Sequence, residues 1–287
     1  MAATECHDNG LSNGFSEEGV HQYLVRYIRR LDDLSGKRVL DIPCGEGRAT
    51  WEFRRKNAEV IALDLFPEFL RVADVEARYA DLTEPLPVES ASVDYVVCEE
   101  GIEHVPNQLA VLEEFNRVLR PGGRLLLTTP NDSHLRARIA RLLFETDLWK
   151  RMPPTELDSV WFANDASDKL YLGHLFLVSV QHLQSLATFS GFQVTNRYRT
   201  TIGKTSVALT MAAYPLLVLA SLATYLAYRR KNRHVAEPVR KKILWERVKL
   251  NLSLKTLCCK HIFWELTKVE SLAENRARLK RLVRRAA

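Results

Sequence analysis

Short apolar runs alternate with amphipathic segments along most of the chain. The apolar runs are typical of buried strands and read KRVLDIPC, AEVIALDL, ARYADL, VDYVVC, GRLLLTT and FQVTNRYR. Residues between most of these runs have helical spacing, as in NQLAVLEEFNRVLR, which precedes a turn expected at residues 121–123. A further helix is expected from Ser16, which would be its N-cap. This alternation predicts an α/β fold whose parallel sheet carries helices on both faces.

A different pattern occupies the segment from Ser206 to Tyr228. It contains no charged residue, and the basic sequence RRKNRH follows it directly. A transmembrane helix needs about 20 mostly apolar residues, so this segment is long enough to span a bilayer. Whether it does so depends on where its two ends lie in the fold.

Charge and cysteine content narrow the class of protein. The 287 residues have a net charge of +6, and two basic clusters lie at residues 229–242 and 276–285. Such clusters favour contact with an anionic surface, either acidic lipid or nucleic acid, although a solvated helix face is the alternative for the final one. The five cysteines lack metal-ligand spacing, and the amino terminus MAATECHDNG is polar. We therefore expect a cytoplasmic protein without a secretory signal.

The segment VLDIPCGEGRAT carries the first sign of a binding site. An expected strand ends at Asp41, and Gly45 and Gly47 then allow a tight turn of the backbone against a ligand. A G-x-G turn also opens dinucleotide sites, but Thr50 stands where such sites have a third glycine. Acidic residues end the next two expected strands, at Asp64 and Asp81.

Together with LRPGGRLLLTTPN, these motifs resemble the class I S-adenosylmethionine-dependent methyltransferases, in particular the small-molecule branch related to quinone O-methyltransferases. The resemblance implies a Rossmann-like, seven-stranded, mostly parallel sheet with S-adenosyl-L-methionine as cofactor. It also implies that Asp41, Gly45 and Gly47 contact the methionine part. The other implied cofactor-binding residues are Asp64 at the ribose hydroxyls, Leu65 beside the adenine, Asp81 at the adenine amino group, Leu82 through its amide, and Glu99.

The sequence CEEGIEHVP follows the fourth expected strand and supplies candidate catalytic residues. In related families Glu-x-x-Glu-His lies beside the reacting methyl group, and the matching residues are Glu100, Glu103 and His104. The chemistry calls for a base that takes a hydroxyl proton or a cation that favours the oxyanion. We disfavour a divalent metal, and the two glutamates could instead orient the loop. His134 and His174 are interpreted as structural.

The family's sheet ends with an antiparallel strand, for which HIFWELTKVE is the candidate. A single crossing by residues 206–228 would separate this strand from its partners, and the charged interval 229–260 offers no return span. In a single crossing, the basic residues after Tyr228 would also stay in the cytoplasm, and the domain before Ser206 would be exported. We therefore expect a disordered terminus at 1–15, a core at 16–205, an apolar and basic helical insertion at 206–260, the last strand at 261–270 and a basic helix or tail at 271–287.

These features predict a methyltransferase that acts on a hydroxyl of a small, lipid-linked or glycan-like acceptor, in peripheral contact with the inner face of an anionic membrane. The alternative for residues 206–228 is that they pack on the protein as a lid or a dimer face. Glu99-Glu100-Gly101 replaces the Asn/Asp-Pro-Pro-aromatic motif of DNA adenine methyltransferases. The alternatives are an RNA-directed or nitrogen-directed methyltransferase and a non-catalytic S-adenosylmethionine-binding scaffold. Nucleic acid is disfavoured because no binding module is recognisable, and the sequence does not indicate an oligomeric state.

Overall fold

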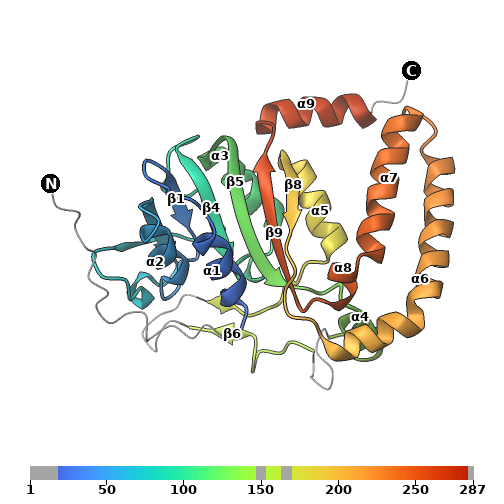
Figure 1. Cartoon of the computed structure of the whole chain (residues 1–287), viewed down its shortest axis with the longest axis horizontal. Helices are drawn as coiled ribbons and strands as arrows, with labels where there is room; N and C mark the ends of the chain where they lie inside the picture. Colours follow the sequence, from blue (N-terminus) through green and yellow to red (C-terminus); the bar gives the residue numbers. More distant parts are fainter. Residues whose placement is uncertain (1–18, 147–152, 163–169, 284–287) are drawn as a thin grey trace.

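The computed structural model describes residues 19–146, 153–162 and 170–283 (Figure 1). The expected disordered terminus at 1–15 and the expected N-cap Ser16 lie outside these residues. In chain order the elements are α1 (His21–Arg29), β1 (Arg38–Asp41), α2 (Arg48–Arg54), β2 (Glu59–Asp64), η1 (Pro67–Phe69), β3 (Ala77–Tyr79), β4 (Val93–Glu99), η2 (Ile102–His104), α3 (Gln108–Val118), β5 (Leu119–Pro130), α4 (Leu135–Phe144), β6 (Val160–Trp161), β7 (Tyr171–Leu172), α5 (Val180–Phe189), β8 (Phe192–Arg197), α6 (Lys204–Lys231), α7 (Glu237–Leu252), α8 (Leu254–Cys258), β9 (His261–Lys268) and α9 (Leu272–Val283).

Seven strands form one sheet in the order β3-β2-β1-β4-β5-β9-β8. The first five strands along this order pair in parallel, whereas β9 is antiparallel to both of its neighbours. This arrangement confirms the Rossmann-like sheet, the position of its last strand and the helical insertion between β8 and β9. The carboxyl ends of β1, β2 and β4 consequently meet at one edge, where ligands bind in open α/β sheets.

Helices cover both faces of the sheet, as the alternation of apolar runs predicts. On one face Leu24 and Ile28 of α1 and Phe53 of α2 pack against residues of β1, β4 and β5. On the other face α3 and α5 pack over a larger apolar cluster that includes Phe115 and Leu183. Because helices cover both faces of the central strands, the sequences of these strands are continuous apolar runs.

Two elements begin elsewhere than the sequence predicts. The helix expected from Ser16 begins at His21, after Gly19 in a left-handed conformation with φ of +86°. The turn expected at residues 121–123 lies inside β5, because Val93 already pairs with Leu119 and the register shifts before the next pair. The Pro-Gly-Gly sequence therefore forms an irregularity within a long strand and not a boundary between a helix and a strand.

The insertion between β8 and β9 leaves and rejoins the sheet at one point. The amide of Gly203 donates a hydrogen bond to the Cys258 carbonyl at 2.9 Å, and the amide of Lys260 donates to the Thr201 carbonyl at 2.8 Å. Beyond this junction α6 runs along one end of the molecule, turns, and then lies beside α7 (Figure 1). Pro215 lies inside α6 and cannot donate the helical hydrogen bond, which is a common cause of such a bend.

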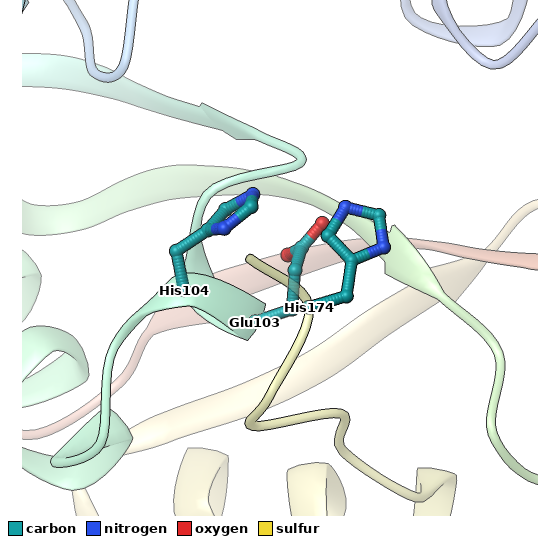
Figure 2. A group of neighbouring side chains, drawn as sticks. All are labelled: Glu103, His104 and His174. Carbon is teal, nitrogen blue, oxygen red and sulfur yellow. The ribbon is translucent and has the colours of Figure 1, made fainter. Parts of the chain in front are cut away.

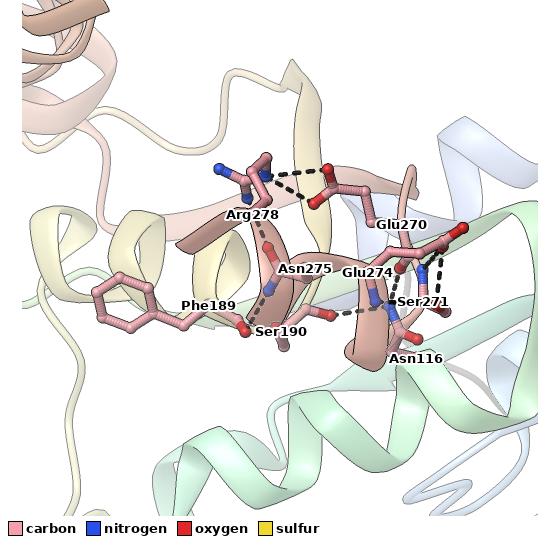
Figure 3. A network of polar contacts seen from close by, with 8 residues as sticks. All are labelled: Asn116, Phe189, Ser190, Glu270, Ser271, Glu274, Asn275 and Arg278. Carbon is pink, nitrogen blue, oxygen red and sulfur yellow. Dashed lines mark hydrogen bonds and ion pairs between the residues drawn. The ribbon is translucent and has the colours of Figure 1, made fainter. Parts of the chain in front are cut away.

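Polar side chains anchor the carboxyl-terminal helix α9 to the core (Figure 3). The buried Asn116 amide donates to the carbonyls of Ser190 and Glu270, at 2.8 and 2.9 Å. Asn275 is fully buried and donates to the Phe189 carbonyl at 2.5 Å. Because each amide joins segments distant in sequence, the network fixes α9 to the end of α5.

Gly191 lies within this network, and its replacement should be costly. Its φ is +80°, and an added Cβ would lie 2.6 Å from the Glu270 carbonyl oxygen and 2.8 Å from Asn116 Nδ2. We expect Gly191→Ala to lower the free energy of unfolding by about 3 kcal/mol, through backbone strain and the loss of these contacts. Urea unfolding of the purified protein measures the change.

Gly122→Ala is the matched control for this prediction. Gly122 has a similar φ of +75°, but nothing lies within 4 Å of the added Cβ. In this variant the free energy of unfolding should fall only by the strain of the left-handed conformation, about 1–2 kcal/mol. Equal losses at the two positions would contradict the role of the close contact at Gly191.

Candidate cofactor and catalytic site

A pocket of about 250 Å³ lies at the carboxyl ends of the parallel strands. Five residues singled out from the sequence line it: Asp64, Leu65, Asp81, Leu82 and His104. Further lining residues that the sequence did not single out include Ile42, Pro43, Phe66, Ala80, Thr83, Gly101, Val105, Pro106, Leu170, Tyr171 and Leu172. The other expected cofactor-binding residues, Asp41, Gly45, Gly47 and Glu99, are not among those that line it.

Asp64 is held in place by backbone groups at the end of β2. One carboxylate oxygen accepts a hydrogen bond from the Gly45 amide at 2.8 Å, and the other accepts from the Phe66 amide at 2.9 Å. The side chain is buried, with an exposed fraction of 6%. A fixed carboxylate at this position can accept hydrogen bonds from the two hydroxyls of a ribose.

Asp41 supports the glycine turn from behind. Its carboxylate accepts hydrogen bonds from the Thr50 amide at 2.9 Å and the Thr50 hydroxyl at 2.6 Å, so it caps the first turn of α2. Burial raises its pKa to about 7. Gly45 and Gly47 both have positive φ, and a Cβ at Gly47 would lie 2.5 Å from Leu70 and Val72 side chains. This close packing requires glycine at position 47.

Asp81 and Glu99 occupy opposite flanks of the site. Asp81 accepts from the amide and hydroxyl of Thr83, at 2.9 and 2.7 Å, which forms a local turn at the pocket wall. Glu99, at the end of β4, lies 3.1 Å from His21 Nδ1. The sequence analysis missed His21, because only the packing of α1 beside β4 brings it to this edge.

Glu100 and Glu103 are two buried carboxyls close to each other. Burial raises the pKa of both, and for Glu100 the charge of Glu103 adds to this effect. The Thr129 hydroxyl donates to Glu103 Oε2 at 2.9 Å. The Oε1 atoms of both glutamates are buried and have no hydrogen-bond partner among the described residues. A bound ligand that donates a hydrogen bond or carries positive charge would satisfy these oxygens.

His104 lies between these carboxyls and the β6–β7 hairpin. Its Nδ1 is 2.7 Å from the Leu172 carbonyl oxygen, and its ring stacks on Tyr171 with centroids 5.1 Å apart. Burial lowers the pKa of His104, so the neutral imidazole predominates at pH 7. A proton on Nδ1, which the carbonyl requires, makes Nε2 the basic nitrogen of the neutral ring.

The structure also brings His174 to this group, although the sequence favoured a structural role for it. Figure 2 shows the Glu103 carboxylate between the rings of His104 and His174. The ring centroids are 5.0 Å apart, and the ligand atoms of the three residues lie within 4.8 Å of one another. A carboxylate and two imidazoles fit a divalent cation such as zinc, which would satisfy the orphaned Glu103 oxygen and polarise an acceptor hydroxyl.

Comparisons with known proteins agree with this fold and pocket. The methyltransferase domain family matches residues 17–196. The ubiquinone biosynthesis O-methyltransferases of Xanthomonas oryzae and Xylella fastidiosa are each 37% identical over 114 residues, covering 37% of this chain and 48% and 46% of theirs. The chain therefore matches about half the length of these relatives. An S-adenosylmethionine-dependent methyltransferase structure from Listeria monocytogenes has a TM-score of 0.50 at 12% identity, covering 88% of this chain and 100% of that chain.

The sheet order and the pocket define a Rossmann-like α/β fold with a ligand-sized pocket at the carboxyl edge of the strands. The chain belongs to the methyltransferase domain family. S-adenosyl-L-methionine is its cofactor.

Proposed function

We propose that the protein O-methylates a small, lipid-linked acceptor at the cytoplasmic surface of a membrane. The observation that carries this proposal is the long apolar face that α6 turns outward. The names of the relatives, ubiquinone biosynthesis O-methyltransferase, support oxygen as the target and a small molecule as the acceptor. The buried Glu103 carboxyl and the half-buried His104 imidazole beside the cofactor pocket provide the chemistry that a hydroxyl needs.

In the proposed reaction His104 acts as the general base. S-adenosylmethionine supplies an electrophilic methyl group bound to a positively charged sulfur. His104 Nε2 takes the proton from the acceptor hydroxyl as its oxygen bonds to the methyl carbon and the carbon–sulfur bond breaks. Glu103, fixed by Thr129, and Glu100 border the reacting atoms. Much of the rate enhancement would come from alignment of the oxygen, methyl carbon and sulfur.

A surface helix of a soluble protein buries its apolar side chains and exposes its polar ones, and α6 does the reverse. Its buried residues are Ser206, Thr210 and Ser221. The exposed apolar residues are Met211, Tyr214, Leu216, Leu219, Leu222, Leu226 and Tyr228. Among the described residues, α6 alone is long and apolar enough to cross a membrane. A helix with its polar residues inside and its leucines outside is suited to contact with lipid.

The polar groups inside α6 hold the helix to the protein. The Asn251 amide of α7 donates to the Ser221 hydroxyl at 2.9 Å, and the Ser206 hydroxyl lies 3.3 Å from His134 Nδ1. The Cys258 thiol of α8 donates to the Thr210 hydroxyl at 3.5 Å. Since these contacts fix the inner side of the helix, its leucine side is presented outward as a preformed surface.

The fold favours contact with the membrane surface over a crossing. β8 and β9 pair with each other, so both ends of the insertion lie on the same side of any bilayer. A return span through α7 would carry charged residues such as Arg240, Lys242 and Arg247 into the hydrocarbon. Arg229, Arg230 and Lys231 end α6, where they can meet anionic headgroups. Peripheral attachment on the cytoplasmic side satisfies all three constraints.

An assay with two acceptors tests this proposal. One acceptor is a dihydroxybenzene with a long isoprenoid chain held in anionic phospholipid vesicles, and the other is the same ring without the chain in solution. We expect the wild-type protein to methylate both and to sediment with the vesicles. Leu216→Glu/Leu219→Glu should lower transfer to the vesicle-held acceptor at least about tenfold, because charges on the lipid side oppose insertion. Transfer to the soluble acceptor should not change.

Val269→Glu/Val283→Glu is the matched control. Both valines are exposed and lie outside the insertion, so this variant adds the same charge without altering α6. It should retain vesicle binding and transfer to both acceptors. If the α6 variant methylates the vesicle-held acceptor as fast as this control, the membrane-surface part of the proposal is wrong. Lack of transfer to either hydroxyl by the wild-type protein would refute the choice of acceptor.

A further inference from the structure

A second groove, of about 710 Å³, lies on the α1 side of the sheet, away from the cofactor pocket. One wall is a stripe of α1 with Tyr23, Arg26 and Tyr27, continued by Arg30 directly after the helix, and the floor comes from β5, β8 and β9. In Figure 1, α1 crosses β4 and β5, and no helix crosses β9 or β8 on the side that faces the reader. The groove is within the size range of small-ligand sites.

Aromatic rings in mutual contact form the floor. Tyr198 and Phe263 have ring centroids 4.7 Å apart, and Tyr27 packs edge-on against both, at 5.4 and 5.8 Å. Because Phe263 is almost fully buried and the three rings brace one another, this surface exists before any ligand arrives. It offers flat apolar area to a ring or a short hydrocarbon group.

The one carboxylate at the groove is already hydrogen-bonded. Glu265 accepts from the Tyr198 hydroxyl at 2.6 Å and the Asn196 amide at 2.8 Å, and it pairs with Arg124 at 3.2 Å. The Tyr27 hydroxyl is buried beside the Arg124 side chain. Burial raises the pKa of Tyr27 to about 12, which keeps this hydroxyl protonated as a donor.

Positive charge around the groove is not balanced. Arg26 and Arg30 from α1 and Arg199 after β8 line it, and within the described ranges none of the three has an ion-pair partner. Guanidinium groups present paired N–H donors that match the oxygens of a phosphate. The groove therefore combines donors for an anion with an aromatic floor.

We propose that this groove is a second ligand site for a soluble phosphate ester that carries a ring. Arg26, Arg30 and Arg199 would bind the phosphate, and the rings of Tyr27 and Tyr198, supported from below by Phe263, would contact the organic part. The three arginines without an ion-pair partner argue against a second protein chain, because charged residues are depleted from the core of a protein interface. In Figure 1, α1 and the upright part of α6 lie apart, with β9, β8 and α7 between them, so a bilayer against α6 would leave the α1 side of the sheet open to water. The site is independent of the proposed acceptor.

Calorimetric titration of the full-length protein with phenyl phosphate tests this proposal, with the cofactor site saturated by S-adenosylhomocysteine. We expect one saturable site that binds phenyl phosphate about tenfold more tightly than inorganic phosphate, because only the former contacts the aromatic floor. Arg26→Ala/Arg30→Ala should weaken phenyl phosphate binding at least about tenfold.

Arg54→Ala/Arg55→Ala is the matched control, since these arginines are exposed on or just after α2 and do not line the groove. It should bind phenyl phosphate like the wild type. Equal losses in the two double variants would mean that general positive charge, and not the groove, attracts the anion, and would overturn the proposal. A loss of vesicle binding in Arg26→Ala/Arg30→Ala would overturn it as well, because the groove would then be a lipid headgroup site.

Discussion

Asp64→Ala should weaken S-adenosylmethionine binding at least about 100-fold. The variant removes a buried carboxylate expected to accept two hydrogen bonds from the ribose, each contributing about 1.5–3 kcal/mol when the acceptor is charged. It also removes the acceptor that orders the Gly45 amide in the glycine turn, at 2.8 Å. Calorimetric titration of the purified variant with S-adenosylmethionine measures the loss.

Asp81→Ala provides a graded comparison for this prediction. Asp81 lies at the same pocket but is less buried, and the adenine amino group that it is expected to bind is neutral. We expect a loss of about tenfold there, in line with one hydrogen bond to a charged acceptor. If Asp81→Ala abolishes binding while Asp64→Ala leaves it intact, the assignment of the ribose to Asp64 is wrong.

His104→Ala should slow methyl transfer about 100-fold or more while leaving S-adenosylmethionine affinity nearly unchanged. A positioned general base contributes about 10²–10⁴-fold to such a step. Only the neutral imidazole can take the proton, and burial lowers the pKa of His104 below its ordinary value of 6.5. The wild-type rate should therefore stay high at pH 7 and fall only as the pH drops below the usual histidine range. Rate measurements across pH test both statements.

The pH profile separates a catalytic His104 from a merely structural one. In His104→Ala the acid limb that belongs to this residue should disappear along with most of the rate. His182→Ala is the control, because His182 is an exposed histidine of α5 far from the pocket lining. An unchanged acid limb in His104→Ala would remove this residue from the role of base.

Much of the fold could be predicted from the order of apolar runs. Parallel strands that are buried on both faces appear in the sequence as clear apolar runs. Once HIFWELTKVE is interpreted as the antiparallel strand, the insertion must lie between β8 and β9. The orientation of α6 could not be predicted in the same way. Its apolar residues surround the helix without a period, so the sequence does not show that Ser206, Thr210 and Ser221 form the inner side.

Some residues of the candidate site could likewise be predicted from the sequence, and others could not. Asp64, Leu65, Asp81 and Leu82 follow strands, so their arrival at one pocket is a consequence of parallel pairing. His174 reaches Glu103 and His104 by another route, because the chain after β7 folds back and the Phe176 amide donates to the Glu103 carbonyl at 3.0 Å. Such irregular segments have no periodic signal, so a histidine within one appears structural until its neighbours in space are known.

The junction at the base of the helical insertion has an evolutionary consequence. Thr201 and Lys260 are hydrogen-bonded neighbours, as are Gly203 and Cys258, so β8 and β9 need only a short turn to remain paired. The helices α6, α7 and α8 can therefore vary as one module, because the entropy of closing a loop changes only slowly with its length. Selection could lengthen, shorten or recharge this module, and so change the outer surface of the protein, without altering how the strands pair or where the pocket lies.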